Sequence, residues 1–160
     1  MKQSKKIIAI ILTLILMGLT LIRENLFLEI NAILSGENIN RANFYLFYEY
    51  FASFSIEKLS LLKWILSIAF IAIMITTSYV ALHFWYEKKQ YNKITGWFYS
   101  VVIVVLLLLV VVTKVTGVFD DAYVLLRKMI GFLQSPLPLF ILFSIYFYLS
   151  KSVDIRKFNK

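Results

Sequence analysis

The chain has 160 residues, no cysteine and a formal net charge of +8, and 61% of its residues are hydrophobic. This apolar share is far above the ~45–50% of soluble domains, so the composition predicts a membrane protein. The lack of cysteine excludes disulfides, thiolate catalysis and cysteine-ligated metals. A single histidine and five scattered glycines provide no nucleophile–base pair and no phosphate-binding motif. We therefore expect no enzyme, no cofactor and no metal site, and the positive charge predicts membrane orientation rather than nucleic-acid binding.

A first transmembrane helix is predicted at residues 7–22, directly after the basic residues Lys2, Lys5 and Lys6. A charged start followed by an apolar run is also typical of a signal peptide. Because the sequence after Leu21 offers no small-residue cleavage site, we expect an uncleaved signal anchor, and cleavage remains the alternative.

The segment 24–56 separates the first two spans, and its second part, residues 43–54, is too short and too aromatic to be a span. Apolar residues at helical spacing fill 24–34, Gly36 is a natural helix stop, and aromatic residues crowd 43–54. We expect two short helices that lie on the membrane surface or fold against the spans. A loop whose aromatic side chains rest in the interface is the alternative.

Two further spans are predicted at residues 61–86 and 97–118. The second contains an uninterrupted run of Val, Ile and Leu from Val101 to Val112. About 20 apolar residues cross a ~30 Å hydrocarbon core as a helix, whereas a lone strand leaves its backbone unsatisfied in lipid. We interpret His83, near the end of the first of these spans, as an interfacial residue.

The fourth crossing, residues 129–150, is interrupted by Pro136 and Pro138. The run after the prolines is shorter than the hydrocarbon core, so the crossing must begin before them and be kinked there, with Gly131 contributing. Upstream, Asp120 and Asp121 are expected to cap a short helix.

The charge distribution tests this arrangement. If both termini face the cytoplasm, ten of the 17 basic residues lie on that side with only Glu87 and Asp154: Lys2, Lys5, Lys6, Lys88, Lys89, Lys93, Lys151, Arg156, Lys157 and Lys160. The positive-inside rule favours this orientation. The sequence thus predicts an all-α polytopic protein, one membrane domain of four transmembrane helices with an aromatic outer segment between the first two.

Polar residues near the outer interface are the candidates for binding a partner or a lipid head group: Arg23, Glu24, Asp120, Asp121, Arg127 and Gln134. An arginine at this depth can pair with a nearby carboxylate, hold a lipid phosphate or dock on a partner. Arg127 and Gln134 are seven residues apart and can share a helix face. Gln134 can also satisfy carbonyls that the kink leaves free.

Two stretches resemble the small exosortase-associated membrane proteins of Bacteroidetes, including those that accompany exosortase F. The first is Leu21–Phe27, with Arg23 and Glu24, and the second runs from Arg127 through Gln134, Ser135 and Pro136 into the aromatic last helix. The family tends to carry Tyr-Asp-Pro soon after the Phe of the first motif, where this chain has Leu28-Glu29-Ile30.

The resemblance implies a non-catalytic accessory subunit of a protein-sorting complex in the bacterial inner membrane. Such a subunit would bind or position a polytopic, exosortase-type partner or the membrane tail of its substrate, with Arg23 and Arg127 marking the surface. Two alternatives remain: a stand-alone protein that binds or handles membrane lipids, and a small homo-oligomeric transporter or channel. The last is disfavoured because no span carries a buried acidic residue.

Overall fold

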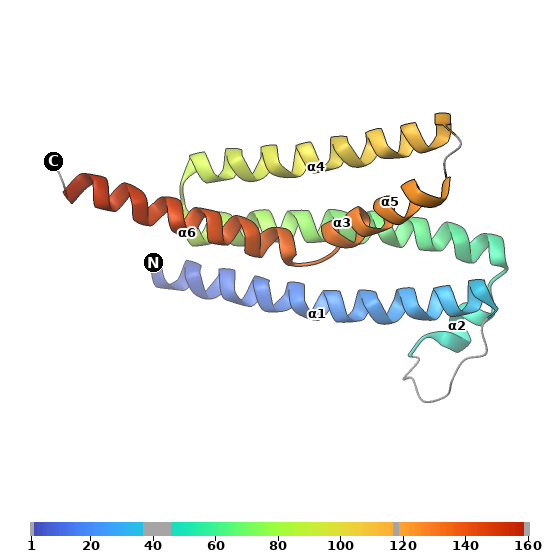
Figure 1. Ribbon diagram of the computed structural model, residues 1–160. Coiled ribbons are helices and arrows are strands. Elements are labelled where there is room, and N and C mark those ends of the chain that lie inside the picture. Colours follow the sequence, from blue (N-terminus) through green and yellow to red (C-terminus); the bar gives the residue numbers. More distant parts are fainter. Residues whose placement is uncertain (1, 37–45, 117–118, 159–160) are drawn as a thin grey trace.

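The computed structural model describes residues 2–36, 46–116 and 119–158, and nearly all of them are helical (Figure 1). The elements follow one another in the order α1 (Lys2–Ser35), α2 (Tyr48–Ala52), α3 (Ile56–Tyr86), α4 (Lys89–Thr116), α5 (Phe119–Leu133) and α6 (Leu137–Phe158). No strand occurs in these ranges, and the predicted all-α class is confirmed. Three of the helices are long and apolar enough to cross a membrane, and the α5–α6 pair is a fourth candidate.

Helix α1 is continuous over 34 residues, so the expected boundary after residue 22 is wrong. No proline or glycine interrupts the stretch from Leu19 to Ser35, and the chain therefore has no local reason to stop sooner. The predicted stop is confirmed at Gly36, whose φ of 66° is left-handed. At ~1.5 Å per residue α1 is about 51 Å long, and it must extend well beyond a ~30 Å hydrocarbon core.

This extension of α1 is covered by α2 and by the first turns of α3. Ile30, Phe51 and Leu59 bring the three helices together in a small buried cluster. The first of the two expected short helices is thus the end of α1, folded against a span. The second corresponds to α2, while residues 37–45 lie outside the described part of the chain.

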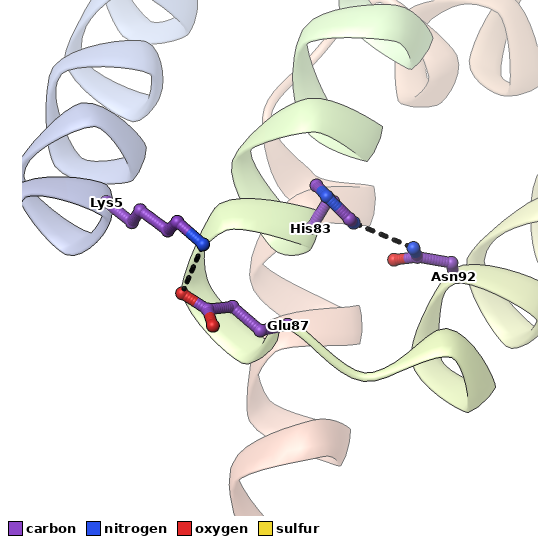
Figure 2. Close-up of polar contacts among 4 residues, drawn as sticks. All are labelled: Lys5, His83, Glu87 and Asn92. Atoms are coloured by element: carbon purple, nitrogen blue, oxygen red, sulfur yellow. Dashed lines mark hydrogen bonds and ion pairs between the residues drawn. The ribbon is translucent and has the colours of Figure 1, made fainter. Parts of the chain in front are cut away.

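Helix α3 runs antiparallel to α1, and α4 returns alongside it (Figure 1). Lys5, near the start of α1, forms an ion pair of 3.2 Å with Glu87 at the end of α3 (Figure 2). Glu87 adopts a left-handed φ of 52°, which allows the tight connection into α4. The predicted end of the third span at Gly117 and Val118 falls outside the described residues.

The fourth crossing is broken, as the prolines predict. Helix α5 ends at Leu133 and α6 begins at Leu137, with a bend of 62° between them. Ser135 Oγ accepts a hydrogen bond of 3.3 Å from the backbone N–H of Leu137, and so caps α6. Gly131 lies inside α5 rather than at the break. Figure 1 shows the pair passing from one end of the bundle to the other, so both termini lie at the same end.

The main core fills the half of the bundle that holds the termini. Leu16, Met74, Leu133 and Leu142 pack there around Tyr146, which is fully buried. The Tyr146 hydroxyl lies 2.8 Å from Thr95 Oγ1 and 2.9 Å from the carbonyl oxygen of Tyr91. The ring of Tyr146 also stacks on that of Tyr91, with centroids 4.5 Å apart. This polar contact joins α4 to α6.

Basic residues and His83 bound an apolar slab across three helices. From Lys6 to Arg23 along α1 is about 26 Å, from Lys63 to His83 along α3 about 30 Å, and from Lys93 to Lys114 along α4 about 32 Å. These spacings match a ~30 Å hydrocarbon core. A membrane placed across this slab would bring Arg23 and Lys63 to one interface and leave α2 with the extension of α1 beyond it.

Candidate partner-binding site

One hydrogen bond joins the two stretches that carry the polar candidates. Arg23 Nε, on α1, donates to Gln134 Oε1 over 3.0 Å, although the two residues are 111 positions apart in the chain. Gln134 Nε2 in turn donates to the Ser67 carbonyl oxygen of α3 over 2.9 Å. Gln134 is fully buried, so it links α1 and α3 to the break between α5 and α6.

The expectation that Gln134 satisfies carbonyls freed by the kink is wrong. Its amide donates to a carbonyl of another helix, and the Phe132 carbonyl beside the kink instead accepts the Ser135 hydroxyl over 2.8 Å. A short serine side chain reaches its own last turn, whereas the longer glutamine reaches across the bundle. Gln134 thus fixes the position of Arg23.

The guanidinium of Arg23 is held on two sides. Its carbon lies 5.2 Å from the centroid of the Phe27 ring, one turn further along α1, and its Nε is used by Gln134. No carboxylate in the described part of the chain forms an ion pair with it. A guanidinium presents five N–H donors in a planar fork, so its terminal nitrogens suit a carboxylate or phosphate oxygen.

Two more cations lie at the same end of the bundle. Lys63 of α3 and Arg127 of α5 are close enough to repel each other electrostatically. Arg127 is exposed, whereas Lys63 and Arg23 are partly covered. We call Arg23, Lys63 and Arg127 the cationic cluster. It comes from three different helices, and an anion placed beside it would relieve the repulsion.

Of the remaining candidates, Glu24 is exposed and forms no ion pair within the described residues, but its charge is close enough to attract Arg23. Helix α5 begins at Phe119, so Asp120 and Asp121 lie in its first turn rather than at its cap, and their side chains are outside the described set. Arg127 and Gln134 differ in surroundings, because only Gln134 is buried.

Glu29 is an important residue that was not among the sequence-based candidates. Its carboxylate is fully buried and accepts hydrogen bonds from the backbone N–H groups of Leu46 and Phe47, over 2.7 and 2.9 Å. This fastens the start of α2 to α1. The sequence feature that could have indicated this role is a single acidic residue among the apolar residues Leu26, Ile30 and Ile33.

His83 lies at the opposite end, where Figure 2 shows it turned toward Asn92. Its Nδ1 is 2.8 Å from Asn92 Nδ2, so the amide donates and the imidazole accepts. The side chain is exposed, in agreement with an interfacial residue. Across the described ranges, no three His, Asp or Glu side chains come together as a metal site.

Comparisons of the chain with known protein families, with curated proteins and with solved structures found no match.

Proposed function

We propose that this chain is a non-catalytic subunit of a bacterial inner-membrane complex, and that it holds a polytopic membrane partner through the cationic cluster. The partner suggested by the resemblance is an exosortase-type sorting enzyme or the membrane tail of its substrate. The observation that carries the proposal is the hydrogen bond between Arg23 and Gln134. It unites the two stretches on which the resemblance rests in one prearranged group.

The chemistry of the cluster favours an anionic group on the partner. Three cations close to one interface are costly unless an opposite charge or water compensates them. The exposed Glu24 attracts Arg23 electrostatically but forms no ion pair with it, so a partner's carboxylate can still bind the guanidinium. Holding the guanidinium in advance lowers the entropy cost of forming such a pair.

The proposal includes the orientation of the chain in the membrane. With both termini in the cytoplasm, most basic residues lie on the cytoplasmic side, and the cationic cluster and α2 lie on the outer side. An enzyme that processes exported proteins works on that side.

The test is purification of the tagged protein from its native membrane in a gentle detergent, followed by mass spectrometry. Recovery of a polytopic, cysteine-containing membrane enzyme in roughly equal amount would support the proposal. Recovery of the chain alone, at the same yield and after mild crosslinking in the intact membrane, would contradict the proposal.

A further inference from the structure

We propose that the groove between α1, α3 and α6 binds one acyl chain of an anionic phospholipid, from the leaflet nearest the two termini. This groove is at the opposite end of the bundle from the cationic cluster. The inference is therefore independent of the proposed partner.

The groove is apolar and has room for a chain. Its volume is about 240 Å³, just below the ~300 Å³ at which ordinary small-molecule pockets begin. Its floor consists of the buried residues Ala9, Ala81, Leu82 and Leu139. Its rim consists of Ile10, Leu14 and Phe140, which are 48%, 62% and 42% exposed. A groove with a closed floor and an exposed apolar rim admits a chain sideways from the bilayer.

The break in the fourth crossing explains why the groove is present. Helix α6 begins at Leu137, near the middle of the bundle, after the 62° bend. As a result α1 and α6 both pack on α3 but make little contact with each other. From Lys6 to Leu14 along α1 is about 12 Å, close to half of a ~30 Å hydrocarbon core. The groove thus has the depth of a single leaflet.

The charges at the mouth of the groove determine which lipid it takes. Lys6 Nζ lies 5.6 Å from the centroid of the Trp85 ring, and Trp85 lines the groove. The neighbouring Lys5 is engaged by Glu87, as Figure 2 shows, whereas Lys6 forms no ion pair with a carboxylate among the described residues. A lysine beside an interfacial tryptophan favours a phosphate-bearing, negatively charged head group.

The experiment uses the full chain with Trp85 as its only tryptophan, obtained with Trp64→Phe and Trp97→Phe. In neutral vesicles, a small and increasing fraction of brominated phosphatidylglycerol or brominated phosphatidylcholine quenches the Trp85 fluorescence. We expect quenching to saturate, with a midpoint about fivefold lower for the anionic lipid, since one lysine near a membrane surface contributes about that much. A chain in which Trp97 is the only tryptophan is the control, because that ring is 74% exposed and lies outside the groove.

Two variants separate the parts of the inference. Lys6→Gln should abolish the preference for the anionic lipid, whereas Lys89→Gln, an equal charge loss at the same end, should leave it intact. Thr13→Phe should fill the groove and remove saturation while helix content stays unchanged. Quenching that rises in proportion to the bromolipid fraction, as for the Trp97 control, would overturn the inference. So would saturation without a head-group preference, or a groove occupied by a second copy in crosslinking.

Discussion

Gln134 is the residue that positions Arg23 within the cationic cluster. It is fully buried, and both ends of its amide are used, by Arg23 and by the Ser67 carbonyl. A buried glutamine without partners would destabilise the fold, and these two hydrogen bonds offset the cost of burying its amide. Losing it leaves a guanidinium without its positioning group.

Replacing Gln134 by Leu should therefore destabilise the fold. Two hydrogen bonds are lost while the volume is nearly kept, and the expected cost is about 1–3 kcal/mol. The measurement is the temperature at which the purified protein loses its monodisperse peak in detergent, which should fall by several degrees. Asn92→Ala, which removes an exposed pair with His83, should change it much less. Equal shifts for both variants would contradict the role of Gln134.

A second substitution tests whether Glu29 holds α2 against α1. Glu29→Ala removes both acceptors from the Leu46 and Phe47 backbone N–H groups, so these amides should exchange with solvent faster. Hydrogen–deuterium exchange with mass spectrometry of a peptide covering 46–54 reports the change, and Glu24→Ala is the exposed acidic control. Unchanged exchange in Glu29→Ala would mean that the apolar contacts of Phe51 alone hold α2.

The helices themselves follow from apolar length, and the bend follows from proline. Pro136 and Pro138 each lack an N–H, and Ser135 caps the new helix, so the break was predictable from three neighbouring residues. The length of α1 could also be predicted, since no proline lies before Gly36. An apolar run of span length marks the part of a helix that can cross a membrane, but it does not mark where the helix ends.

Replacing both prolines, and so restoring their backbone N–H donors, should straighten the α5–α6 crossing. In a Pro136→Ala, Pro138→Ala variant, we expect the distance between spin labels at Leu125→Cys and Tyr148→Cys to lengthen, on the order of 5 Å. Both positions are exposed, and the natural chain contains no competing cysteine. A label pair at Trp97→Cys and Val115→Cys, within α4, should not change. If the first distance also stays fixed, packing rather than proline sets the bend.

Contacts between distant elements could not be predicted in the same way. The sequence singled out Arg23 and Gln134 separately, but nothing local says that residues 111 positions apart share a hydrogen bond. Carboxylates were expected beside the arginines because opposite charges attract. Within the described residues, Arg23 contacts an amide and an aromatic ring and is attracted by Glu24 without forming an ion pair, and Arg127 is exposed.

At the scale of the whole molecule, the arrangement has two different ends. One carries the termini, the basic turn between α3 and α4, and the mouth of the groove. The other carries the cationic cluster, α2 and the extension of α1. The chain is long enough along α1 to extend beyond the membrane only at this second end.

The proposed orientation can be tested by labelling one residue at each of these two ends. With Ser53→Cys and Gln90→Cys as separate single-cysteine variants, a membrane-impermeant maleimide should label only the first in intact spheroplasts. Both side chains are exposed, so reactivity reports the side of the membrane. Detergent should make the second react equally well. Labelling of Gln90→Cys alone before detergent would reverse the topology and remove the cationic cluster from the outer side.

The central claim is that the cationic cluster holds a membrane partner. Its most direct test is the amount of partner recovered with Arg23→Glu, Arg127→Glu and the double variant, each compared with Lys128→Glu, an exposed charge reversal next to Arg127. We expect each single reversal to lower recovery about tenfold or more, since a like charge opposes the partner's anion by at least ~1.4 kcal/mol, and Lys128→Glu to leave recovery near the wild-type level. Full recovery with the double variant, at equal protein yield, would contradict the account.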